Sequence, residues 1–211
     1  MTRIIMIRHG QSEANRARVF AGHTDALLSE KGRAQAMAAA EYLRLHERID
    51  AVYASDLSRA TETARYTADL FSLPIHPERE LREIFAGEWE GLSFDTLDAD
   101  FTEDRARWRN DLAHAFCTGG ESIASVFDRT LAAVTRIARE NEGKTVLIAA
   151  HWTPVLTMIC TAEGYGVEHI GTCTEPKNAS LSIMRFENGV FSPERLNITE
   201  HLGDLAERAH L

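Results

Sequence analysis

The stretch that decides the fold is residues 3–10, RIIMIRHG. Its four consecutive apolar residues, Ile4 to Ile7, are typical of a short strand buried on both faces of a sheet. Two further runs of this kind are Ala51–Ala54 and Val146–Ala150. Each run is followed at once by a polar side chain, so the sequence predicts three buried strands with polar residues at their carboxyl ends.

Helical patterns separate the three predicted strands. Ser29 can cap a helix that runs to about His46, and Ser55 or Asp56 can cap another that runs to about Leu73. Two later helices are predicted over Glu121–Asn141 and Thr153–Glu163. Because strands alternate with helices, the chain is predicted to be α/β, with three α/β/α layers and a mixed, mostly parallel central sheet.

The last third of the chain departs from this alternation. Leu181 to Phe186 reads as a strand, Asn188-Gly189 as a tight turn, and Val190 begins a second strand. At least one antiparallel strand is therefore expected at a sheet edge. The length of 211 residues supports one domain over residues 1–211, and residues 84–120 are expected to form a lid or insertion over the sheet.

The amino-acid composition limits the kinds of molecule that the protein is expected to bind. Acidic residues outnumber basic ones, 32 against 23, for a formal charge of -9, which argues against nucleic acid or a membrane surface. The three cysteines have no CxxC spacing, and the N-terminus lacks the pattern of a signal peptide, so a cytoplasmic protein is expected. The histidines show no HxH or HExxH spacing, so no metal site is expected. The oligomeric state is left open, with a homodimer as one option.

Polar residues after the strands are the first candidates for a functional site, because open α/β sheets bind ligands there. They are Arg8, His9 and His151, with Arg59 in the first turn of the following helix. A cation there opposes the helix dipole, at a cost of roughly 0.3–1 kcal/mol, unless an anion lies between them. The helix start and the guanidinium can hold one anion together, so a phosphate site is predicted.

Residues 8–15, RHGQSEAN, resemble the signature of the histidine phosphatase superfamily, also called the phosphoglycerate mutase-like family. Residues 55–60 (SDLSRA), residues 81–91 (LREIFAGEWEG) and His151 match further motifs in the same order. Gly120-Glu121-Ser122 is also similar. The resemblance covers residues 3 to about 155, and this ordered set is far more specific than Arg-His-Gly alone.

The resemblance implies a nucleophile and a proton donor. His9 would attack phosphorus and form a phosphohistidine, and Gly10 would let the backbone come close to the anion. Glu83 would protonate the leaving oxygen and then take a proton from the attacking water. Glu80, Glu88 and Glu90 are rivals for that role, and the motif favours Glu83.

The resemblance also implies a phosphate-binding set. Arg8, Arg59 and His151 would hold the phosphoryl oxygens, and Asn15 would add a neutral donor, although an Asn after a strand is also a common helix cap. These positive charges make a metal unnecessary, and no cofactor is expected. His23 lies in a loop where the resemblance places substrate-facing groups, and a plain surface histidine is the competing interpretation.

Trp152 is a departure, because the family usually has Gly after its second His. A bulky residue there is expected to line a substrate pocket, to tilt His151, or to point into the core. The predicted function is a metal-independent phosphomonoesterase acting through a phosphohistidine at His9.

One alternative is a cofactor-dependent phosphoglycerate mutase, an isomerase. Residues 85–91, FAGEWEG, instead resemble the phosphatase branch. The other alternative is a noncatalytic phosphate-binding protein.

Overall fold

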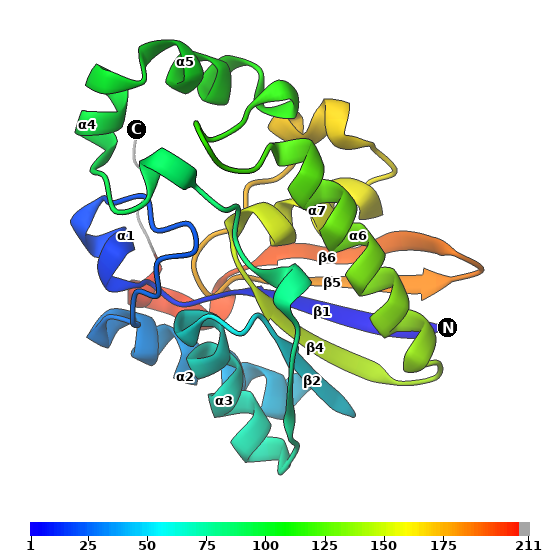
Figure 1. Cartoon of the computed structure of the whole chain (residues 1–211). Coiled ribbons are helices and arrows are strands. Elements are labelled where there is room, and N and C mark those ends of the chain that lie inside the picture. Colours follow the sequence, from blue (N-terminus) through cyan, green and yellow to red (C-terminus); the bar gives the residue numbers. More distant parts are fainter. Residues whose placement is uncertain (207–211) are drawn as a thin grey trace.

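A computed structural model describes residues 1–206, and its centre is a six-stranded sheet in the order β3-β2-β4-β1-β5-β6 (Figure 1). The strands span, in sequence order, β1 Thr2–Arg8, β2 Ala51–Ala54, β3 Ile75–Pro77, β4 Thr145–Ala150, β5 Leu181–Glu187 and β6 Val190–Ile198. Strands β1 to β4 pair in parallel, and β5 and β6 are antiparallel. The predicted mixed, mostly parallel sheet is confirmed.

Alternating side chains of β1 build a core on each face of the sheet. Ile4 and Met6 pack with α6 (Ile123–Glu140) and α7 (Trp152–Ala162). Ile5 and Ile7 pack with α2 (Glu30–His46) and α3 (Ser58–Phe71). Both sets are buried, so each face of the sheet is covered by a pair of helices, as in a three-layer α/β/α fold (Figure 1).

Most predicted elements are confirmed, and the start of α3 is a correction. We expected Ser55 or Asp56 to cap this helix, but its N-cap is Leu57, which makes no side-chain cap hydrogen bond. Asp25 caps the helix from outside instead, because its carboxylate accepts the Ser58 N–H at 2.8 Å. The sequence analysis also did not predict the short edge strand β3.

The segment between β3 and α6 holds short elements above one side of the molecule (Figure 1). Its helices are α4 (Phe94–Asp100) and α5 (Thr102–Asn110). Trp89 is fully buried in a third core with these helices, and the ring centroids of Trp89 and Trp108 are 5.6 Å apart. The segment therefore packs through aromatic side chains into a core that it shares with α6 and α7.

The short helix α1 (Glu13–Ala17) follows β1 and starts at a capping box. Ser12 accepts the Asn15 backbone N–H, and the Asn15 side chain accepts the Ser12 N–H at 3.0 Å. The turn before this helix packs tightly on α2. A Cβ atom at Gly10 would lie 2.3 Å from the carbonyl oxygen of Gly32, and one at Gly32 would lie 2.0 Å from that of Gln11. Only glycine fits at either position.

Gly32→Ala should destabilise the protein, because its methyl group would collide with backbone that cannot swing aside. Overpacking of this kind costs about 1–3 kcal/mol, which lowers Tm by several degrees in a chain of this size. Thermal unfolding measures the effect. Gly171→Ala is the matched control, since its nearest neighbour is Leu112 at an ordinary 3.5 Å. Equal melting temperatures for the two variants would contradict this account.

Candidate active site

A cavity of about 720 Å³ opens at the carboxyl ends of the parallel strands. Six of the predicted site residues line it: Arg8, His9, Asn15, Arg59, Glu83 and Trp152. They come from segments far apart in the sequence, and the sheet topology brings them together.

His9 follows β1 directly and is only 4% exposed. Its Nδ1 atom lies 2.7 Å from the carbonyl oxygen of Gly10. Because a carbonyl oxygen only accepts hydrogen bonds, this contact places the ring proton on Nδ1 and leaves the lone pair on Nε2. Burial, together with the charges of Arg59 and Arg8, holds the pKa of His9 well below its ordinary value. His9 is therefore a neutral imidazole.

Arg59 is the second residue of α3 and is 1% exposed. Its guanidinium donates to the carbonyl oxygens of Gly22 at 2.7 Å and Thr24 at 3.0 Å. Burial lowers its pKa, but a guanidinium keeps its charge in proteins. A fixed positive charge thus lines the cavity beside His9, as an anion site requires.

Asn178 links His9 to Asn15 through two hydrogen bonds. This buried side chain donates to the His9 carbonyl at 2.8 Å and to the Asn15 side-chain oxygen at 3.3 Å. Because that oxygen also accepts from Ser12, the Asn15 amide group is oriented with its NH₂ free of these contacts. The prediction of Asn15 as a helix cap and its place in the cavity are therefore compatible.

The Arg8 guanidinium donates to the Pro176 carbonyl oxygen at 2.8 Å.

His151 lies behind the cavity wall rather than on it, fully buried, with its ring centroid 5.1 Å from that of His9. Its Nε2 is 2.8 Å from the Ser55 hydroxyl. Its buried Nδ1 has no hydrogen-bond partner within residues 1–206. Burial and the charge of Arg59 keep the pKa of His151 well below its ordinary value, so this ring is also neutral.

Glu83 is bound to the start of α7. Its carboxylate accepts the backbone N–H groups of Trp152 at 3.0 Å and Thr153 at 3.2 Å. The positive end of the helix dipole fixes it there. Its predicted rivals do not line the cavity: Glu80 and Glu88 are exposed, and Glu90 accepts backbone N–H groups of the loop at residues 23–24.

Two further predicted residues support the cavity without lining it. The Gly10 N–H donates to the Thr63 hydroxyl at 3.1 Å. His23 contacts the Glu83 carbonyl oxygen through Nε2 at 2.9 Å, and its ring lies tilted against that of Phe85. His23 thus contacts the segment that carries Glu83, and it does not face the cavity.

Trp152 both lines the cavity and packs against the third hydrophobic core. It is partly buried and stacks on Trp108, with ring centroids 6.4 Å apart. Its Nε1–H donates to Glu175 at 2.9 Å. Trp152 and Trp108 together form an apolar part of the cavity wall.

Sequence reasoning missed Asn178, Ser55 as the partner of His151, and Thr63. Asn178 lies between two predicted elements. Only the structure marks this segment as unusual, because the neighbouring Ala179 has a positive φ of 55°. The sequence predicts Ser55 as a possible helix cap, whereas in the structure its hydroxyl contacts His151.

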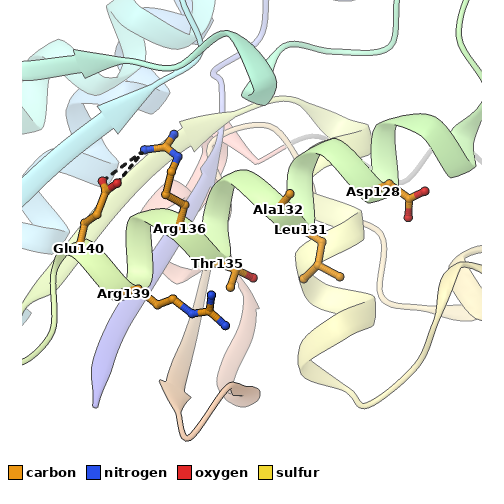
Figure 2. A pocket seen from close by; sticks show the side chains of 7 residues that line it. All are labelled: Asp128, Leu131, Ala132, Thr135, Arg136, Arg139 and Glu140. Atoms are coloured by element: carbon orange, nitrogen blue, oxygen red, sulfur yellow. Dashed lines mark hydrogen bonds and ion pairs between the residues drawn. The ribbon is translucent and has the colours of Figure 1, made fainter.

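A second hollow, of about 540 Å³, lies along α6 between Asp128 and Glu140 (Figure 2). It is open and contains the Arg136–Glu140 ion pair but none of the predicted site residues. Within residues 1–206, no three His, Cys, Asp or Glu side chains gather as a metal site would require. In the same part of the chain, no helix is both long and apolar enough to span a membrane.

A neutral imidazole, two guanidinium groups and a carboxylate around one cavity can attack, hold and release a phosphoryl group. The family model of the histidine phosphatase superfamily (branch 1) matches residues 4–199. Phosphoserine phosphatase 1 of Hydrogenobacter thermophilus is 32% identical over 100% of this chain and 99% of its own length.

Solved structures agree with the family match. A mycobacterial glucosyl-3-phosphoglycerate phosphatase, solved in complex with VO3, superposes with a TM-score of 0.85 at 30% identity, covering 92% of this chain and 98% of its own. YhfR of Bacillus stearothermophilus superposes with a TM-score of 0.89 at 29% identity, covering 96% of this chain and 100% of its own. The chain belongs to the histidine phosphatase superfamily (branch 1) and is a phosphomonoester hydrolase of that family, as its sequence predicts.

Proposed function

We propose that His9 is the nucleophile of a metal-independent phosphomonoesterase. The observation that carries this proposal is the contact between His9 Nδ1 and the Gly10 carbonyl, because it leaves the Nε2 lone pair free. The neutral state of the ring supports the same role, since a protonated imidazole has no lone pair for attack. Arg8 and Arg59 supply the positive charge that a transferring phosphoryl group requires.

In the first step, Nε2 of His9 forms a bond to phosphorus while the bond from phosphorus to the leaving oxygen breaks. Glu83 gives its proton to that oxygen, and the product alcohol leaves. In the second step, Glu83 takes a proton from water, which attacks phosphorus and releases inorganic phosphate from His9. Arg8, Arg59 and the Asn15 amide hold the phosphoryl oxygens throughout, and Gly10 keeps the turn close to them.

His151 completes the phosphate site in this proposal. The Ser55 hydroxyl accepts the Leu57 N–H at 3.4 Å, so its hydrogen can be donated to His151 Nε2. The ring proton then lies on Nδ1, the buried atom that lacks a partner within residues 1–206. A phosphoryl oxygen would give this N–H the acceptor it needs.

The substrate is a small phosphomonoester, with Trp152 on the leaving-group side and His23 supporting Glu83 from behind. We propose that residues 1–211 form one domain, with residues 84–120 as the lid that selects the leaving group. We also propose a cytoplasmic enzyme, and the charge of -9 argues against nucleic-acid or membrane partners. A homodimer stays a prediction that sedimentation would test.

His9→Ala should abolish phosphate release from p-nitrophenyl phosphate while Tm stays within a few degrees of the wild type, because no other group can replace the nucleophile. His114→Ala, at an exposed histidine outside the cavity, is the control and should be fully active. Quenched wild-type enzyme should carry an acid-labile, base-stable phosphate. Substantial activity in His9→Ala would refute the mechanism. A parallel assay with and without bisphosphoglycerate separates hydrolysis from mutase transfer.

Glu83→Gln should slow hydrolysis of an alkyl phosphate by roughly 10²–10⁴-fold, the usual contribution of a general acid. It should slow p-nitrophenyl phosphate much less, because that leaving group needs little protonation. The measurement is kcat/KM for both substrates, with the exposed Glu88→Gln as the control. Equal losses on the two esters would assign Glu83 a structural role.

Lowering the pH from about 7 to about 5.5 should destabilise the wild type more than His9→Asn. Burial and Arg59 lower the pKa of His9 in the folded protein, whereas the unfolded chain keeps the ordinary value of 6.5. Below that pH the unfolded state binds a proton that the folded state does not, so the free energy of unfolding falls as pH falls. Urea denaturation at both pH values tests this. Equal losses in the two proteins would show that folding does not lower the pKa of His9.

A further inference from the structure

Arginine side chains dominate the outer part of the active-site cavity. Arg105 and Arg109 both pair with Asp98, which also lines the cavity. Arg18 lines the cavity from the opposite segment, at the end of α1. Its side chain makes no hydrogen bond or ion pair within residues 1–206. It therefore offers a positive charge that no described residue neutralises.

The backbone at Arg18 is held in a conformation that favours glycine. Its φ of 56° and ψ of 44° are left-handed, which costs a non-glycine residue roughly 1–2 kcal/mol. Its N–H donates to the Ala14 and Asn15 carbonyl oxygens, and its own carbonyl accepts the Phe94 N–H at 3.0 Å. Contacts on both sides thus fix the point from which the guanidinium extends. Arg18 therefore occupies a position where glycine would be less strained.

The position of Arg18 places its charge close to the phosphate site. The Arg18 N–H bonds to the Asn15 carbonyl oxygen at 3.1 Å, so the two residues are one turn apart. His9, Asn15 and Arg18 line the same cavity. A group held by Arg18 would therefore share this cavity with a phosphate held beside His9.

The charges around Arg18 select one kind of group. The cavity also contains the carboxylates of Asp98 and Glu175, and Glu175 accepts the Trp152 indole N–H. One unneutralised guanidinium matches a singly charged carboxylate, which it can bind through two parallel hydrogen bonds. Arg18, Arg105 and Arg109 stand against these two carboxylates with an excess of one positive charge, which a single carboxylate balances and a second phosphate dianion would exceed.

We propose that Arg18 binds a carboxylate of the substrate, so that the enzyme prefers phosphomonoesters that carry a carboxylate within a few bonds of the phosphate. This inference rests on the proposed function at His9. It assigns to Arg18 the choice between substrates and leaves the bond-breaking steps to the residues around the phosphate.

Two substrate pairs that differ at a single group test the proposal. O-phosphoserine differs from phosphoethanolamine only by its carboxylate, and 3-phosphoglycerate differs from glycerol 3-phosphate by a carboxylate in place of a hydroxymethyl group. We expect the wild type to favour the carboxylate member of at least one pair by roughly tenfold or more in kcat/KM, the scale of a charged hydrogen bond.

Arg18→Gly should bring that ratio close to one. It should leave kcat/KM for the member without the carboxylate within about twofold of the wild-type value. Because glycine suits the left-handed backbone, Tm should be unchanged or higher, which separates lost selectivity from lost folding. Arg18→Lys keeps the charge and should retain part of the ratio. Arg16→Ala removes a neighbouring exposed guanidinium that pairs with Glu13, and it should keep the full ratio.

The outcomes distinguish this inference from the proposed function. If the wild type hydrolyses p-nitrophenyl phosphate through His9 but shows no carboxylate preference in either pair, the assignment of Arg18 is wrong and the phosphatase stands. The same holds if Arg18→Gly keeps the preference, or slows both members of a pair equally. If p-nitrophenyl phosphate is not hydrolysed, the function proposed for His9 fails first.

Discussion

The burial of one guanidinium charge shapes the rest of this site. Arg59 is almost fully enclosed, and moving a charge out of water is costly unless fixed dipoles and opposite charges replace its hydration. Two loop carbonyls at Gly22 and Thr24 do this, helped by the charge of Glu83. The loop after α1 must therefore fold over α3, and burial together with the same positive charge lowers the pKa of His9.

Local signals made most of the fold predictable. The apolar runs of β1 and β4 are continuous because both faces are covered, and Ser29 caps α2 within its own segment. The start of α3 could not be predicted, because its cap, Asp25, lies 33 residues away from Ser58. Strand β3 is only three residues long and offers too short a pattern to recognise.

The same distinction applies to the site. Residues carried by motifs or strand ends, such as His9 and Arg59, were predictable and lie together in the cavity. Asn178 and Arg18 were not predictable. Asn178 contacts His9, which lies 169 residues away in the sequence, and Arg18 is distinguished by its left-handed backbone. Composition and spacing record neither kind of information. His23 was found by its motif, yet only the structure places it behind Glu83.

The anchoring of Glu83 on the first turn of α7 has a consequence for biosynthesis. Glu83 comes from the middle of the chain, but the backbone groups that hold its carboxylate belong to Trp152 and Thr153. Strand β1 likewise finds its parallel partner only when Thr145 to Ala150 is available, and such distant pairings form late. A nascent chain therefore carries the His9 turn long before it can turn over substrate, and catalysis begins only once α7 has left the ribosome and docked.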